Sequence, residues 1–214
     1  VYAFLHVKFP LFTSKVNYRN HRKIVVIDGT TGFVGGFNIG REYISKDPQF
    51  GYWRDTHLKI KGEAAISLQI RFALDWNYAT GENLFKDLSY FGDEAARKRP
   101  MGEGNGHIWP KDQADAEQVY MQIITSGPDT REPHIRNNYL ELFHKAKHHI
   151  YIQTPYFIPD DAIFSSLKIA ALSGVDVRLM IPCKPDHPFV YWATCSYAGE
   201  LLDYGARVYI YENG

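Results

Sequence analysis

The chain of 214 residues contains few cysteines and no long hydrophobic segment. Cys183 and Cys195 are its only cysteines, too few for a disulfide framework, so a reducing environment is the default expectation. No apolar run approaches the length of a membrane-spanning helix, and no signal peptide is visible. If the protein is anchored in a membrane, we expect the anchor to lie outside this sequence.

The sequence also lacks an excess of charge of either sign. Lys and Arg number 24, Asp and Glu number 24, and the formal net charge is +0. Because nucleic-acid-binding proteins usually carry a basic excess, we expect no nucleic-acid partner. Aromatic residues make up 15% of the chain, which indicates a globular protein rather than a disordered one.

One segment concentrates chemically reactive side chains. It reads His21-Arg22-Lys23-Ile24-Val25-Val26-Ile27-Asp28, and Gly35-Gly36-Phe37-Asn38 follows it. The apolar run 24–27 predicts a strand buried on both faces, which the turn-forming pair Asp28-Gly29 ends. Side chains two residues apart on a strand project to the same side, so His21 and Lys23 are expected to point into one space.

These residue types suit chemistry on a phosphodiester. The neutral imidazole of His21 can attack phosphorus and hold the group as a phosphohistidine. Lys23 supplies a point charge for a non-bridging phosphate oxygen, and Asn38 can donate to another. Gly36 has no Cβ, so its backbone N–H can approach an anion closely. The scheme requires no metal and no other cofactor.

A nucleophilic histidine needs an acceptor that holds its second ring nitrogen and fixes the tautomer. Asp28 is one candidate. Asp55, within Tyr52-Trp53-Arg54-Asp55-Thr56-His57, is the second. Asp55 is favoured, because Asp28 lies at the turn and is better placed to stabilise the end of the strand.

The pattern HxKxxxxD followed by GGxN resembles the signature of the phospholipase D superfamily. The similarity to bacterial cardiolipin synthases extends over further sequence segments, residues 17–29, 32–40, 52–57 and 152–160. The resemblance implies an α/β phospholipase D-like fold, with mostly parallel or mixed sheets flanked by helices. It assigns catalysis to His21, Lys23 and Asp28, and binding or orientation of the phosphate to Asn38, Gly36 and Asp55.

The resemblance also implies an activity and a setting. The enzyme would be a phosphatidyltransferase that converts two phosphatidylglycerol molecules to cardiolipin and glycerol through a phosphohistidine. Its partners would be phosphatidylglycerol, other phospholipids and the membrane surface. It would act at the bacterial cell membrane, with its active site facing the cytoplasm.

Members of this superfamily carry two such motifs in two similar halves, and the second histidine acts as general acid and base. No second His-x-Lys-x4-Asp occurs in this sequence. We therefore expect an internal fragment, inactive alone, with one half and a partial second half. The expected domains are 1–86, which holds the motif, a linker over 87–115, and the second half over 116–214, which lacks it.

Other functions remain open on the sequence. A phospholipase D or phosphodiesterase that uses water as acceptor would need the same His, Lys and Asn. A nuclease is a third possibility, which salt-dependent DNA binding would favour. A catalytically silent module is a possibility of a different class. The segment 154–157, Thr-Pro-Tyr-Phe, follows a predicted strand, and the resemblance favours it as part of the site, with Tyr156 and Phe157 against an acyl chain or glycerol.

Hydrophobic periodicity predicts alternating helices and strands. The expected helices cover 62–76, 135–148, 160–172 and 188–204, and the expected strands cover 118–126, 149–153, 175–181 and 206–211. Asp160 is expected to cap its helix. His144 and His148 are four residues apart, but no third ligand joins them, so we expect solvated histidines rather than a metal site.

Overall fold

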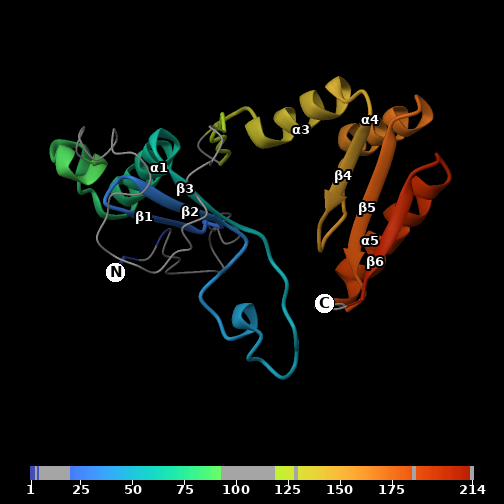
Figure 1. Cartoon of the computed structure of the whole chain (residues 1–214), viewed down its shortest axis with the longest axis horizontal. Helices are drawn as coiled ribbons and strands as arrows, with labels where there is room; N and C mark the ends of the chain where they lie inside the picture. Colours follow the sequence, from blue (N-terminus) through green and yellow to red (C-terminus); the bar gives the residue numbers. More distant parts are fainter. Residues whose placement is uncertain (3, 5–19, 93–118, 128–129, 185–186, 213–214) are drawn as a thin grey trace, which may run out of the picture. The chain divides into compact units, whose positions relative to one another are not determined.

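The computed structural model describes residues 1–2, 4, 20–92, 119–127, 130–184 and 187–212 (Figure 1). The chain forms two compact units, the first made of residues 1–38 and 55–123 and the second of residues 39–54 and 124–214. In the described residues, each unit contains a three-stranded sheet with helices packed on it. The α/β fold class is therefore confirmed.

The first sheet is an antiparallel meander. Its order is β1 (Ile24–Ile27), β2 (Thr31–Gly35) and β3 (His57–Lys61). Asp28 and Gly29 join β1 to β2 with φ angles of 53° and 64°, and the Thr30 N–H donates to the Ile27 carbonyl at 3.2 Å. Two central residues with positive φ make the hairpin turn that Asp-Gly favours, so the predicted turn is confirmed.

Helix α1 (Glu63–Thr80) packs on one face of this sheet. A Cβ added to Gly32 of β2 would lie 2.7 Å from Leu68 Cδ1, so the helix approaches the strand closely. The helix expected over 62–76 is confirmed and runs one turn further. Val25 and Ile27 are 54% and 49% exposed, so the prediction of a strand buried on both faces was wrong. A hairpin covered by a helix on one face exposes alternate residues on the other.

The second unit contains a parallel sheet in the order β4-β5-β6. Helix α3 (His134–Lys145) comes first, and the remaining elements alternate as β4 (His149–Gln153), α4 (Asp161–Leu172), β5 (Asp176–Pro182), α5 (Pro188–Leu202) and β6 (Arg207–Tyr211). The largely parallel sheet is thus confirmed for this unit. Helix α3 ends three residues before the expected end at His148.

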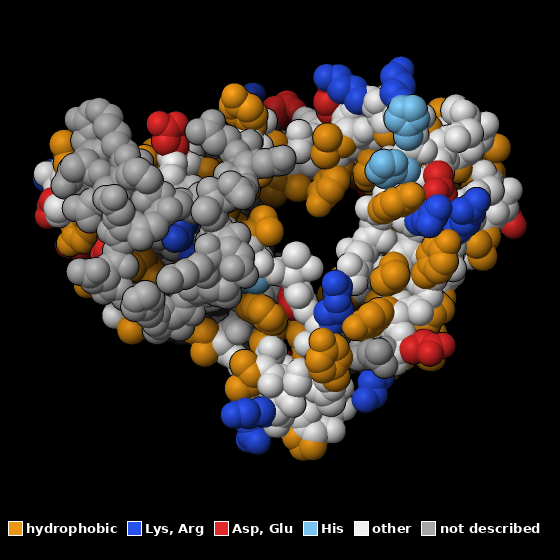
Figure 2. Space-filling view, viewed as in Figure 1, with side chains coloured by type: hydrophobic (Ala, Val, Ile, Leu, Met, Phe, Trp, Pro, Cys, Tyr) orange, Lys and Arg blue, Asp and Glu red, His pale blue; other side chains and the backbone are white. Residues whose placement is uncertain are grey.

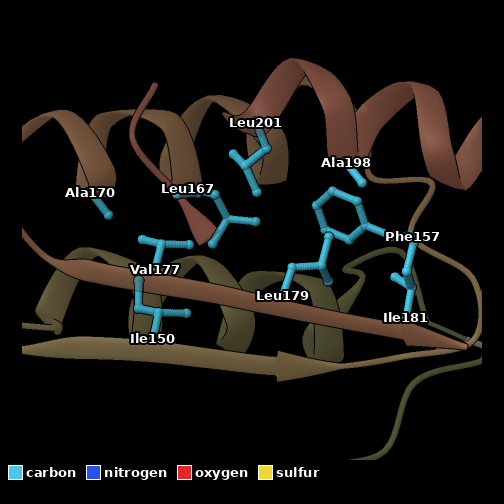
Figure 3. Packing of buried hydrophobic residues seen from close by; sticks show 10 residues of the cluster. Ile150, Phe157, Leu167, Ala170, Val177, Leu179, Ile181, Ala198 and Leu201 are labelled. Carbon is cyan, nitrogen blue, oxygen red and sulfur yellow. The ribbon is translucent and has the colours of Figure 1, made fainter. Parts of the chain in front are cut away.

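The core of the second unit lies between its sheet and two helices. Val177, Leu179 and Ile181 of β5 are at most 2% exposed and face α4 and α5. Figure 3 shows Leu167 of α4 and Leu201 of α5 directed toward these strand residues. Every second residue of β5 is buried in this way, which is the pattern of a strand with one fully covered face.

The stretch after α1 differs from its predicted structure in part. The strand expected over 118–126 was wrong for residues 119–126, which have no regular structure, and Tyr120 is almost fully exposed. The expected linker over 87–115 begins with the short 3-10 turn η4 (Leu88–Phe91), which follows η3 (Leu84–Lys86). Residues 93–115 of it lie outside the described residues, and the domain boundaries stay predictions.

Large hydrophobic side chains also reach the surface beside charged ones (Figure 2). In α5, Phe189 and Trp192 are 81% and 63% exposed, and their rings meet edge to face with centroids 5.4 Å apart. No helix within the described ranges combines the length and the apolar character that crossing a membrane requires.

Asp160 caps α4 as expected and also pairs with α3. Its carboxylate accepts the Ala162 and Ile163 amides at 3.0 Å, and the Arg136 guanidinium binds both of its oxygens. The hydrogen bond from Arg136, followed by that from Ile163, lowers the pKa of Asp160 from 3.8 to about 2. The carboxylate therefore holds α3 against the start of α4 in its charged form.

This geometry predicts acid sensitivity that depends on Asp160. A carboxyl with a depressed folded-state pKa stabilises the fold above its unfolded value, and that contribution is lost as the pH falls from about 4 through about 2. Asp160→Asn keeps a capping side chain but cannot ionise. We expect it to lower the thermal unfolding midpoint near neutral pH, and the difference from wild type to vanish near pH 2. Parallel pH profiles for the two proteins, measured by circular dichroism, would contradict the assignment.

Candidate functional site

The segment that leads into β1 carries the two central candidates. The strand begins at Ile24, so His21 and Lys23 precede it rather than lie within it. The Lys23 ammonium donates to the His21 carbonyl oxygen at 2.8 Å, which folds the lysine back over residue 21. His21 is exposed and Lys23 is half-buried, so both can meet a ligand from solvent.

The two residues that flank His21 are held to helix α1. The side chains of Asn20 and Arg22 both bind the Asp75 carboxylate on α1, at 3.3 Å and 3.2 Å. The side chains on both sides of His21 are thus turned toward α1. That His21 and Lys23 point into one space stays a prediction of the motif.

The glycine turn after β2 lies against the segment that carries Asp55. The Gly36 N–H donates to the Thr56 carbonyl at 3.1 Å, and the Asp55 carboxylate accepts the Thr56 N–H at 2.7 Å. A Cβ at Gly36 would overlap the Asp55 carboxylate. Gly36 therefore leaves the space that the Asp55 carboxylate occupies. The Gly36 N–H was expected to contact an anion, but it bonds to a carbonyl of the protein instead.

His57 is a residue at this site to which the sequence analysis gave no role. It pairs with Gly35 across β2 and β3, its ring stacks on Phe37 with centroids 5.4 Å apart, and its Nδ1 atom is buried without a hydrogen-bond partner. The register pairs Ile24 with Val34, next to the Gly35 that His57 faces, so β1 begins close to His57. The sequence signal that could have pointed to His57 is its position two residues after Asp55.

The other two candidates lie at turns. Asp28 is exposed at the far end of β1 from His21, and four strand residues at about 3.3 Å each separate the two by at least about 13 Å. Asn38 is exposed at the end of the glycine turn. The chain then runs through residues 39–54, which contain the 3-10 turn η2 (Glu42–Ile44), before it returns at Asp55.

The segment expected to line the site in the second unit is only partly accessible. Phe157 is 5% exposed, belongs to the core, and donates its N–H to the Thr194 hydroxyl at 3.0 Å. Its expected contact with an acyl chain or glycerol is therefore contradicted, because the ring packs between α5 and the sheet. Tyr156 is 44% exposed and stays a candidate.

An open hollow of about 420 Å³ lies on the parallel sheet, lined by Tyr151, Ile152, Gln153, Arg178, Met180 and Tyr209. The positively charged side chain in this hollow, Arg178, already interacts with other side chains of the protein. Arg178 pairs with Asp176 at 2.6 Å and lies 4.9 Å from the centre of the Tyr151 ring. The hydrogen bond from Arg178 lowers the pKa of Asp176. We find no convergence of catalytic groups there.

Metal ligands do not gather within the described part of the chain, where no three His, Cys, Asp or Glu side chains are placed to hold an ion. His144 is exposed at the end of α3, with Nε2 3.3 Å from the Ser166 hydroxyl. His148 is exposed beyond that helix.

Comparisons with known proteins find similarity at two levels. Residues 139–214 match the family model described as cardiolipin synthase, PLD-like domain. The whole chain is 49% identical to a cardiolipin synthase of Listeria innocua and to the major cardiolipin synthase ClsA of Bacillus subtilis, and 48% identical to a cardiolipin synthase of Oceanobacillus iheyensis. Residues 139–214 are therefore similar to a phospholipase D-like domain.

Over its whole length the chain is similar to bacterial cardiolipin synthases, as the motifs predicted. The alignments cover all of this chain, and it spans 41%, 41% and 40% of the length of these three relatives. The family match lies in the second unit. The alignments with the relatives also cover the first unit, which carries His21 and Lys23.

Proposed function

We propose that the protein carrying this sequence is a phosphatidyltransferase of the cardiolipin synthase type, which converts two phosphatidylglycerol molecules to cardiolipin and glycerol at a membrane surface. The observation that carries the proposal is the hydrogen bond from the Lys23 ammonium to the His21 carbonyl, which holds the cation beside the candidate nucleophile. Identity of 49% to proteins named cardiolipin synthase supports the choice of reaction.

The reaction proceeds in two displacements at phosphorus. A ring nitrogen of His21 forms a bond to phosphorus, the bond to the glycerol oxygen breaks, and glycerol leaves after it takes up a proton. The terminal hydroxyl of a second phosphatidylglycerol then loses its proton and attacks the phosphatidyl-histidine. The P–N bond breaks, cardiolipin is released and the imidazole is restored. A general acid and base outside the first motif serves both proton transfers.

The remaining residues bind and orient. Lys23 neutralises a non-bridging oxygen and Asn38 donates to another, so that charge is stabilised where it develops. Asp55 is the proposed acceptor for the second ring nitrogen of His21. We assign Asp28 to the hairpin turn, because its position at the far end of β1 separates it from the imidazole.

Product analysis tests the proposed reaction. The complete protein is incubated with phosphatidylglycerol vesicles, and lipids and glycerol are quantified by mass spectrometry. We expect cardiolipin and glycerol in equal amounts. Phosphatidic acid without cardiolipin would overturn the proposal in favour of a hydrolase with water as acceptor. No turnover and no covalent adduct would overturn it in favour of a silent module.

Substitution of Gly36 tests the role of Asp55 without touching the carboxylate itself. In Gly36→Ala, the added methyl displaces the Asp55 side chain. Since the end of a side chain moves more readily than backbone, we expect the unfolding midpoint to change little and cardiolipin formation to fall about tenfold, as misplaced catalytic groups cause.

Gly199→Ala in α5 is the matched control, because a Cβ there meets nothing within 4 Å. It is expected to leave synthesis unchanged and to stabilise the helix slightly. Equal activity of the Gly36 and Gly199 variants would remove Asp55 from the site.

A further inference from the structure

Asp75 of α1 gathers three side chains around one carboxylate. It accepts hydrogen bonds from Asn20 Nδ2 at 3.3 Å and from Arg22 Nη1 at 3.2 Å, and it forms an ion pair with Arg71 one turn earlier on the helix. The side chains of Asp75, Arg71 and Arg22 are only 12%, 17% and 23% exposed. Shielded charged hydrogen bonds of this kind hold geometry more firmly than exposed ion pairs.

Two of these contacts come from alternate residues of the segment that carries the candidate nucleophile. Asn20 and Arg22 flank His21, and the Arg22 N–H also donates to the Asn20 side chain at 2.9 Å. The carboxylate thus fixes the residues on both sides of His21 to the helix. With those two side chains held to α1, the backbone that carries the imidazole is fixed between two anchored residues.

The negative charge of Asp75 also keeps two positively charged side chains together. The carboxylate lies between the guanidinium groups of Arg22 and Arg71. Without it, two like charges with little access to solvent would face each other, and their repulsion would act on the segment that carries His21. Loss of the carboxylate is therefore expected to push His21 and Lys23 out of position.

We propose that Asp75 is a positioning residue for the His21–Lys23 pair: it sets the direction of both side chains through Asn20 and Arg22 without touching the lipid. This inference rests on the proposed function of the pair. A residue that only positions catalytic groups changes the rate of the chemical step and leaves lipid binding nearly unchanged.

The test compares Asp75→Ala with Arg71→Met in the complete protein. Arg71→Met removes the pair within α1 but keeps the contacts of Asp75 with Asn20 and Arg22, so it is the matched control. We expect Asp75→Ala to lower kcat for cardiolipin formation about 10- to 100-fold, with KM within about twofold. Arg71→Met should lower kcat less than about threefold, and Asp75→Glu should recover most of the activity.

A spectroscopic readout separates this proposal from the proposed function. The NMR signal of the His21 imidazole, in protein labelled at histidine, should shift in Asp75→Ala and stay in place in Arg71→Met. A shift confined to Asp75→Ala supports positioning even if the protein makes no cardiolipin. If Asp75→Ala does not fold, the double variant Asn20→Ala with Arg22→Met removes the same contacts and should lower kcat equally. Equal kcat and equal spectra for the Asp75 and Arg71 variants would overturn the proposal, as would an unchanged kcat in the double variant.

Discussion

Replacement of His21 by alanine is expected to lower the rate of phosphatidyl transfer by more than about a thousandfold, which corresponds to at least about 4 kcal/mol of lost transition-state stabilisation. The methyl group cannot form the covalent bond to phosphorus that divides the reaction into two displacements. The measurement is cardiolipin formation from phosphatidylglycerol under single-turnover conditions, so that lipid binding and product release do not mask the loss.

His148→Ala is the matched control, because His148 is also exposed but belongs to the second unit. It is expected to retain wild-type activity, and both variants are expected to keep the wild-type unfolding midpoint. If the His21 variant retained more than about a tenth of the activity, the assignment of the nucleophile would be wrong.

Replacement of Lys23 by methionine should lower kcat about 10²- to 10³-fold, the usual loss when a charge-stabilising donor is removed. Methionine keeps the apolar stem of the half-buried lysine, so the loss reports on the ammonium rather than on packing. Lys23→Arg should recover activity only in part, because a planar guanidinium does not replace a compact ammonium that also bonds the His21 carbonyl.

Lys61→Met controls for the general loss of a positive charge, since Lys61 is exposed on β3 of the same sheet. It is expected to change the rate less than twofold. Equal losses in the Lys23 and Lys61 variants would show that the surface charge of the unit matters, and would leave Lys23 without a specific role.

Local signals in the sequence predicted the regular elements well. The Asp28-Gly29 pair predicted the hairpin turn, since few residue pairs adopt positive φ twice in succession. The alternation of apolar runs predicted the parallel strands, and Asp160 predicted the start of α4. These features depend on neighbours in the sequence, which is why the pattern was enough to find them.

The parts that failed depend on contacts between distant segments. Burial of β1 on one face only follows from the helix that packs on it, and the run 24–27 carries no sign of that helix. The fit of Gly36 against Asp55 joins residues nineteen positions apart. Asp75 lies more than fifty residues from the segment that it holds, and nothing in the local pattern around it points to His21.

The most direct test of the central claim is to trap the covalent intermediate. The complete protein is mixed with phosphatidylglycerol, quenched under alkaline conditions within a turnover, digested and examined by mass spectrometry. We predict a phosphatidyl group on the peptide that contains His21, and its absence in the Lys23→Met protein at the same time point. Cardiolipin formation with no adduct, or with the adduct on another residue, would contradict the account.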